Sequence, residues 1–196
     1  EADVADGARI RLVKRIPMQG GLGGGSSDAA ATLRACARLW RLDESPAALE
    51  PLGRRLGADV PFFLHGGTAR GTGRGDRVTP LAPFGERELL LGRPPFGLPT
   101  PQVFQKATRR LTLPSNSVSF SALFGHKWNW PNDLAVLAND LERGVFEAWP
   151  ELGRFHERML EAGASRALLS GSGSTVFGVF EDGEQRDRAL ERLIGE

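Results

Sequence analysis

A glycine-rich stretch near the start of the sequence, PMQGGLGGGSSDAA over residues 17–30, has the composition of a phosphate-binding loop. Glycines let anion oxygens approach the backbone closely, and the free N–H groups and dipole at a helix N-terminus favour negative charge. The hydroxyls of Ser26 and Ser27 can hydrogen-bond a phosphate oxygen or bind Mg²⁺. The stretch therefore predicts a phosphate cradle at the beginning of a helix.

Two better-known glycine motifs fit this stretch poorly. The Walker A pattern matches Gly20 and Gly25, but Ser26 stands where that pattern needs lysine. The dinucleotide pattern matches Gly21 and Gly23 but also fails at Ser26, and Asp43, at the distance of a ribose-binding acid, is expected in a turn between helices. A flexible loop before a capped helix remains the interpretation without function.

Three other segments hold residues that could act on a phosphate ester. Asp59 precedes a predicted strand, where a carboxylate is usually a turn or capping residue but can also serve as a general base. Residues 170–174, SGSGS, join two apolar segments and are typical of a hairpin turn. Thr100 and Phe104 share one face of a predicted helix, where Phe104 alone would be interpreted as a core residue.

The composition excludes several classes of partner. Lys and Arg number 25 against 24 Asp and Glu, so bulk charge gives no attraction to nucleic acid or to a membrane surface. The single cysteine, Cys36, excludes an internal disulfide and indicates a reducing cytoplasm. No apolar run is long enough to cross a bilayer. The sequence predicts neither the oligomeric state nor the ligands of a metal.

The elements that must position these residues read as α+β, with domains over residues 1–82 and 83–196. The first domain is predicted to begin with a strand over 8–16 and a helix from Ser26 that has Asp28 in its first turn. A second helix is predicted between its N-cap Ser45 and Gly57, followed by a strand in VPFFLHGG. ARGTGRGDRVTPL is expected as a hairpin or as a loop with a short strand.

The second domain is predicted to begin with a strand in ELLLGRPP and a helix in TPQVFQKATRRL. Helices follow over residues 132–149 and 151–161, and then a strand, the SGSGS turn and another strand. A final amphipathic helix is predicted with its apolar face at Ala189, Leu190, Leu193 and Ile194.

The quoted segments resemble the motifs of the GHMP kinases. PMQGGLGGGSSDAAATL is similar to the second motif of the family, a phosphate loop without a Walker lysine, and LLSGSGSTVFGVF is similar to the third. LGADVPFFLHGGTARGTGRGDRVTPL, LPTPQVF and ANDLE follow in the family order, so that the resemblance covers residues 10–180.

The resemblance implies the two-domain GHMP kinase fold, with part of a ribosomal-protein-S5-domain-2-like N-terminal domain and a ferredoxin-like C-terminal domain. It implies ATP and Mg²⁺ as cofactors. The match is best to the members that phosphorylate the 2-hydroxyl of 4-diphosphocytidyl-2-C-methyl-D-erythritol in non-mevalonate isoprenoid synthesis. The alternatives are another GHMP kinase of small alcohols and a nucleotide-binding module without catalysis.

By resemblance, Asp59 is the catalytic base and the SGSGS turn closes the site through Gly171, Ser172 and Gly173. Thr100 contacts the methylerythritol portion of the substrate and Phe104 packs on its cytosine ring. The implied nucleotide-binding residues are Pro17, Met18, Gln19, Gly20, Gly21, Leu22, Gly23, Gly24, Gly25, Ser26 and Ser27.

The sequence departs from the family pattern at its beginning. The first motif of the family, which holds a lysine beside the catalytic aspartate, is absent, and the chain has no tyrosine. These departures predict a fragment of a kinase, with weak or no activity on its own.

Overall fold

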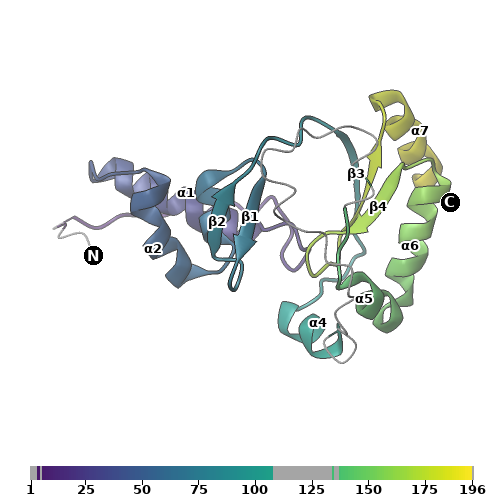
Figure 1. Cartoon of the computed structure of the whole chain (residues 1–196), viewed down its shortest axis with the longest axis horizontal. Helices are drawn as coiled ribbons and strands as arrows, with labels where there is room; N and C mark the ends of the chain where they lie inside the picture. The colour runs from purple at the N-terminus through teal and green to yellow at the C-terminus, as the bar shows by residue number, and fades with distance from the viewer. Residues whose placement is uncertain (1–3, 5, 108–133, 135–136, 196) are drawn as a thin grey trace. The chain divides into compact units, whose positions relative to one another are not determined.

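The computed structural model describes residues 4, 6–107, 134 and 137–195, which form two compact units (Figure 1). The first unit holds the described residues up to Ile16 together with residues 23–84. The second holds residues 17–22, 85–107, 134 and 137–195. The first part of the predicted phosphate cradle therefore packs with residues that are far away in sequence.

The described residues of the first unit form three helices and a two-stranded hairpin. The helices are α1 (Gly24–Leu39), α2 (Pro46–Leu56) and α3 (Val60–His65), and the hairpin pairs β1 (Ala69–Thr72) with β2 (Arg77–Pro80). The predicted limits of α2 are confirmed: the Ser45 side chain accepts a hydrogen bond from the Ala48 N–H at 3.3 Å, and Gly57 follows the last turn.

A small apolar core holds these helices together. Its buried residues come from all three helices: Ala30, Ala37, Leu49, Val60 and Leu64. Alanines on α1 let the neighbouring helices approach closely. The core therefore fixes α3 against α1, the helix that begins at the predicted cradle.

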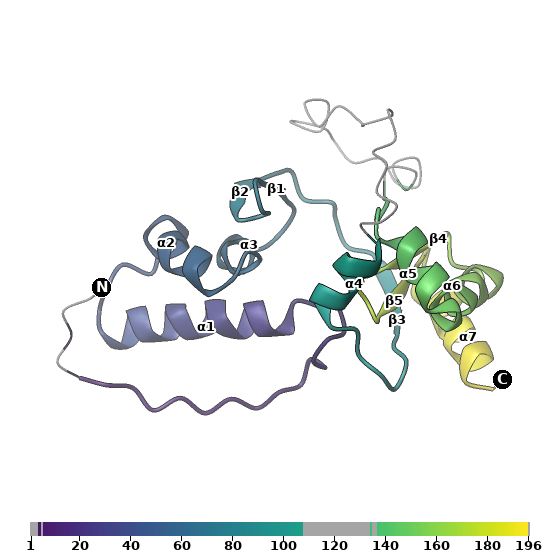
Figure 2. The same ribbon diagram turned by 90° about the horizontal axis from the view of Figure 1, so that it is seen from below.

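Two predicted strands of this unit are wrong. Residues 8–16 are extended beside α1 but pair with no strand in the described part of the chain, and Ile10 and Leu12 are 63% and 58% exposed (Figure 2). A strand needs a hydrogen-bonded neighbour, which alternation along the sequence does not supply. The VPFFLHGG segment forms α3 because Pro61 is tolerated in the first turn of a helix and Gly66 follows its last residue.

The position of Asp28 also differs from the prediction. Because α1 begins at Gly24, its first turn contains no acidic residue, and Asp28 lies in the second turn. There its carboxylate forms an ion pair with Lys14, so Asp28 is not a charge at the helix end.

The second unit is built on an antiparallel sheet of three strands. The strands β3 (Glu88–Gly92), β4 (Arg166–Leu169) and β5 (Val176–Phe180) have the order β3-β5-β4, with Leu89 opposite Val179 and Leu168 opposite Phe177. The helices of its described residues are α4 (Thr100–Ala107), α5 (Glu142–Ala148), α6 (Pro150–Glu161) and α7 (Gly183–Ile194). The core is formed by Leu98, Val103, Val145, Leu152, Met159, Ala167, Leu169 and Val176.

The predicted helix over residues 132–149 is only partly correct. Residues 108–133, 135 and 136 lie outside the described part, and residues 137–141 are not helical. Asn139 interrupts the helical pattern because its Oδ1 accepts a hydrogen bond from the Leu141 N–H at 3.0 Å. In α7, Ala189 is buried as predicted, but Ile194 is 75% exposed.

Residues 17–22 form a turn that the main chain of residues 170–175 holds in place. The N–H groups of Ser174 and Thr175 donate to the carbonyls of Gln19 and Gly20 at 3.3 and 3.1 Å, and the Ser170 hydroxyl donates to the Gly21 carbonyl at 2.9 Å. A Cβ atom on Gly21 would lie 1.9 Å from the Ser170 carbonyl oxygen. Only glycine fits at position 21.

We expect Gly21→Ala to destabilise the second unit by about 3 kcal/mol or more, because the new methyl group meets backbone atoms that cannot rotate away. Gly163→Ala is the matched control: Gly163 has a positive φ of 100° but open space around it. That control should lose about 1 kcal/mol from backbone strain. Urea unfolding followed by circular dichroism measures both, and equal losses would contradict the collision.

Candidate active site

The start of α1 has the features of an anion-binding helix end. Gly23 is the N-cap residue, with φ of 65°, and no side chain caps the helix. Along α1, the first main-chain N–H group that donates a hydrogen bond within the helix is that of Ser27. Its acceptor is the Gly23 carbonyl at 2.9 Å. The N–H groups of residues 24–26 therefore have no acceptor within the helix and are available to an anion.

The glycines at this helix end differ in what they contact. A Cβ atom on Gly23 would lie 2.4 Å from the Phe63 ring, and one on Gly24 would lie 2.7 Å from the Ile16 side chain. Gly25 is exposed and has no atom within 4 Å of the same position. Packing explains the first two glycines. It does not explain Gly25, which as a helix residue costs about 1 kcal/mol relative to alanine.

The turn over residues 17–22 lies beside two side chains that the sequence analysis did not identify. Arg93 donates from its guanidinium to the Met18 carbonyl at 3.3 Å. Thr175 is fully buried, and its hydroxyl has no hydrogen-bond partner among the described residues. That hydroxyl would lie 3.3 Å from a Cβ on Gly20. Neither residue has a sequence signal of its own, because each contact joins segments that are far apart in the chain.

The predicted acceptor-binding residues of the second unit lie partly together. The Thr100 and Ser172 hydroxyls are hydrogen-bonded at 3.1 Å, so α4 and the SGSGS turn are in contact. Phe104 is 46% exposed, so its interpretation as a core residue is wrong. Gly171 and Gly173 occupy the same turn with positive φ values of 54° and 84°.

Asn139, three residues before α5, hydrogen-bonds the SGSGS turn and the strand before it. Its Nδ2 donates to the carbonyls of Leu169 and Gly171 at 2.9 and 2.7 Å. Asn139 lies in the ANDLE segment, whose residues have no role that is evident from the sequence alone. The signal that could have identified Asn139 as a functional residue is its place in a segment that resembles the family.

Asp59 is an exposed residue directly before the first residue of α3. It is the N-cap residue, yet its side chain makes no capping hydrogen bond. Phe63, one turn further along α3, contacts Gly23, so this helix packs against the beginning of α1. Because the Asp59 carboxylate makes no capping hydrogen bond within the part of the chain that the structure describes, it is available to take a proton.

Asp43 and the histidine of α3, His65, have local structural roles. Asp43 accepts a hydrogen bond from the Ser45 N–H at 2.8 Å in the turn between α1 and α2, and this bond lowers the pKa of Asp43. His65 pairs with Glu50 at 2.5 Å. Among the described residues, no group of three or more His, Cys, Asp or Glu side chains could hold a metal ion, and no helix is long and apolar enough to span a membrane.

Two family models match the chain. The model described as "GHMP kinases N terminal domain" matches residues 1–67, and the one described as "GHMP kinases C terminal" matches residues 119–196. The two matches contain the start of α1 and Asp59 in the first, and the SGSGS turn in the second.

Curated relatives and a solved structure agree with these models. A 4-diphosphocytidyl-2-C-methyl-D-erythritol kinase of Thermodesulfovibrio yellowstonii is 38% identical over 98% of this chain and 69% of its own length. One from Nocardioides sp. is 46% identical over 85% of this chain and 57% of its own length.

A crystal structure of 4-(cytidine 5'-diphospho)-2C-methyl-D-erythritol kinase, 36% identical, superposes with a TM-score of 0.71 over 93% of this chain and 65% of that one. The chain thus spans about two thirds of the length of the relatives that it matches. With both domain models matched in order and a relative of this identity along nearly its whole length, the chain belongs to the GHMP kinase family.

Proposed function

We propose that this chain acts in the ATP-dependent phosphorylation of 4-diphosphocytidyl-2-C-methyl-D-erythritol at its 2-hydroxyl, a step of isoprenoid precursor synthesis. The names of its relatives support this acceptor. The observation that carries the proposal is the uncapped start of α1 with open space at Gly25, which suits a polyphosphate and has no packing explanation. We also propose domains over 1–82 and 83–196, a cytoplasmic location, and no nucleic-acid or membrane partner.

The triphosphate of ATP binds along residues 17–27, and its oxygens accept hydrogen bonds from the N–H groups at the start of α1. Mg²⁺ neutralises charge on the phosphates when it is bound. In nucleotide sites Mg²⁺ is usually held by substrate phosphates, water and one or two protein oxygen ligands. The Ser26 hydroxyl, which makes no hydrogen bond to a described residue, is the side-chain group that this helix end offers to it.

Asp59 acts as the general base. The oxygen of the 2-hydroxyl attacks the γ-phosphorus, its proton passes to the Asp59 carboxylate, and the bond from the γ-phosphorus to the bridging oxygen breaks, which leaves ADP. The Asp59 side chain does not cap α3, so a capping hydrogen bond does not compete with the substrate proton for its carboxylate oxygens.

The acceptor lies along α4 and the SGSGS turn. The hydroxyl pair of Thr100 and Ser172 offers donors and acceptors to the methylerythritol hydroxyls. The exposed ring of Phe104, one helical turn from Thr100, offers a flat apolar surface to the cytosine base.

Gly25→Ala tests the cradle without disturbing the fold. We expect affinity for ATP to fall at least about tenfold, because the methyl group occupies the space left for a phosphate, while stability stays equal or rises by up to about 1 kcal/mol. Calorimetric titration and urea unfolding measure the two quantities. Gly7→Ala, which also adds a methyl group in open space, is the control and should change neither. Unchanged affinity in Gly25→Ala would remove the cradle.

Asp59→Asn tests the base. We expect turnover to fall by about 10²–10⁴-fold with unchanged ATP affinity, because the amide cannot accept the proton. ADP release is measured with the cytidylated acceptor, mevalonate and homoserine, on this chain and on a chimaera completed to the length of the Thermodesulfovibrio relative. Asp43→Asn should keep full activity, since asparagine can still accept from Ser45. Turnover of mevalonate or homoserine instead would indicate another GHMP kinase, and no turnover by either protein would favour a binding module.

Phe104→Ala tests the cytosine contact. Because stacking of a base on an aromatic ring contributes about 1–3 kcal/mol, we expect the KM for the cytidylated acceptor to rise about tenfold while the KM for ATP stays constant. Gln105→Ala, an exposed neighbour on α4, is the control. Equal rises in both KM values for Phe104→Ala would argue against a base-specific contact.

A further inference from the structure

Strand β4 lies at an edge of the described sheet, where it pairs only with β5. The Ser170 N–H, directly after β4, donates to the Thr175 carbonyl at 2.8 Å. Because such bonds alternate along an antiparallel pair, the main-chain groups of Leu169 and Ala167 point away from β5, toward the open edge. There the Ala167 carbonyl accepts a hydrogen bond from the His156 Nε2 at 3.0 Å. Side chains therefore satisfy this edge in place of a neighbouring strand.

Two side chains of the ANDLE segment do the same for Leu169. The Glu142 carboxylate accepts a hydrogen bond from the Leu169 N–H at 2.7 Å. The Asn139 Nδ2 donates to the Leu169 carbonyl at 2.9 Å and to the Gly171 carbonyl at 2.7 Å. Leu169 is 2% exposed, so main-chain groups without partners would be costly there. One acceptor and one donor thus bind both main-chain groups at the end of β4.

Helix α5 holds these two side chains in place. Glu142 is its first residue, and the Glu142 N–H donates to the Asn139 carbonyl at 3.0 Å. The Asn139 Oδ1 accepts from the Leu141 N–H at 3.0 Å while its Nδ2 faces the end of β4. The helix is anchored in the core of the unit by Val145, which is fully buried. The two side chains therefore tie the end of β4 to a helix of the core.

The end of β4 determines where the SGSGS turn lies. Gly171, whose carbonyl Asn139 holds, has a positive φ of 54°. Ser172 follows it, and its hydroxyl lies 3.1 Å from the Thr100 hydroxyl. A slip of β4 by one residue would carry the turn about 3.3 Å along the strand, farther than a hydrogen bond can stretch. The contact between Ser172 and Thr100 therefore depends on a fixed end of β4.

We propose that Asn139 and Glu142 are positioning residues of the acceptor site, which act through the end of β4 to hold Ser172 beside Thr100. The inference rests on the proposed function, because it assigns the pair to binding of the cytidylated acceptor. A contact that is formed before the ligand arrives costs less ordering than one that the ligand must assemble. Loss of either side chain should therefore weaken acceptor binding although neither one touches the acceptor.

Asn139→Asp separates the two hydrogen-bonding roles of Asn139. The carboxylate keeps an oxygen that can accept from Leu141, but it cannot donate to the carbonyls of Leu169 and Gly171. We expect the affinity for the cytidylated acceptor to fall at least about tenfold. The affinity for ATP should change less than about twofold, because residues 19 and 20 are held from beyond the turn, by the N–H groups of residues 174 and 175. Calorimetric titration of the full chain measures both affinities.

Glu142→Ala and Glu142→Gln test the other partner. Glutamine keeps an oxygen that can accept from the Leu169 N–H, and alanine does not. In the ligand-free chain, amide hydrogen exchange of Leu169 should become at least about tenfold faster in Glu142→Ala and less than about threefold faster in Glu142→Gln. Acceptor affinity should fall in the same order, with Glu142→Gln close to the unchanged chain.

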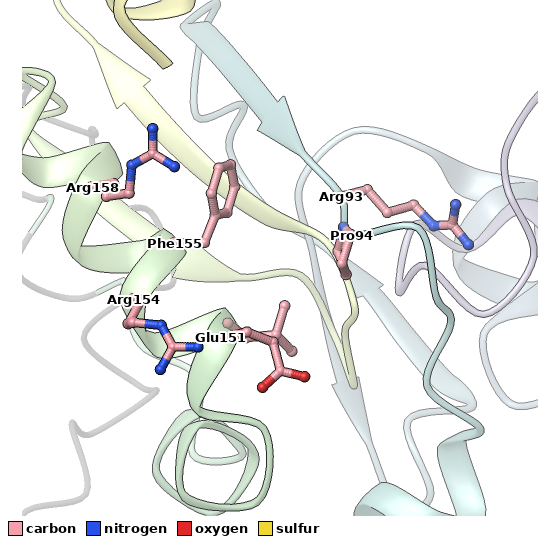
Figure 3. Close-up of a pocket in the computed structure, with 7 residues that line it drawn as sticks. Arg93, Pro94, Glu151, Arg154, Phe155 and Arg158 are labelled. Carbon is pink, nitrogen blue, oxygen red and sulfur yellow. The ribbon is translucent and has the colours of Figure 1, made fainter. Parts of the chain in front are cut away.

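Glu151→Ala is the matched control. Like Glu142, Glu151 is an acid in the first turn of a helix, so its loss has the same effect on the charge at a helix end. It lines a cavity with Pro94 and Phe155 and makes no hydrogen bond to β4 within the described part of the chain (Figure 3). This variant should change neither Leu169 exchange nor acceptor affinity.

The outcomes separate this inference from the proposed function. Acceptor affinity that Asn139→Asp and Glu142→Ala leave unchanged, in a chain that binds the acceptor, would overturn the inference alone. Equal losses of acceptor and ATP affinity would also overturn it, because they indicate a general loss of structure. If the unchanged chain binds ATP but not the cytidylated acceptor, the proposed acceptor is wrong and the inference falls with it, whatever the exchange of Leu169.

Discussion

The arrangement of the site depends on the hydrogen bonds that residues 170–175 make to residues 17–22. Main-chain N–H groups of one turn donate to main-chain carbonyls of the other, and the Ser170 hydroxyl adds a bond to Gly21. These main-chain bonds bring the two backbones so close together that any side chain at position 21 would collide with the Ser170 carbonyl. Position 21 therefore requires glycine. The same turn carries Ser172, which meets Thr100, and is braced by Asn139. One set of backbone bonds thus places the beginning of the phosphate loop with the residues proposed to bind the acceptor.

Local signals predicted the elements that local chemistry decides. The cap Ser45 with Pro46 and Gly57 sets the limits of α2, and the SGSGS turn between two apolar runs gives the β4–β5 pair. The glycine-rich segment expected as a hairpin or as a loop with a short strand forms the β1–β2 hairpin. The two wrong strand predictions concern segments whose structure depends on contacts with other parts of the fold. Residues 8–16 alternate like a strand but have no strand to pair with in the described chain, and the apolar run VPFFLH is too short for its period to separate strand from helix.

The candidate site divides in the same way. The phosphate loop could be proposed from its residue types, because a glycine run followed by serines at a helix start suits an anion. Asp59 could be proposed only from the family motif, since an aspartate at its position is usually a turn or capping residue. Phe104 on its own predicts core, and only its exposure supports a role in binding. Arg93 and the buried Thr175 hydroxyl could not be predicted, since each acts on a turn more than 70 residues earlier in the chain. Spacing along the sequence contains no information on such contacts.

The central claim is that main-chain amides at the start of α1 bind the polyphosphate of ATP. Its most direct test is a ¹⁵N titration of the chain with a non-hydrolysable ATP analogue and, separately, with adenosine. The account predicts large shifts of the Gly24, Gly25 and Ser26 amides with the analogue and none of that size with adenosine, because only the analogue carries phosphates. Binding of the analogue that leaves these three amides unmoved would contradict it.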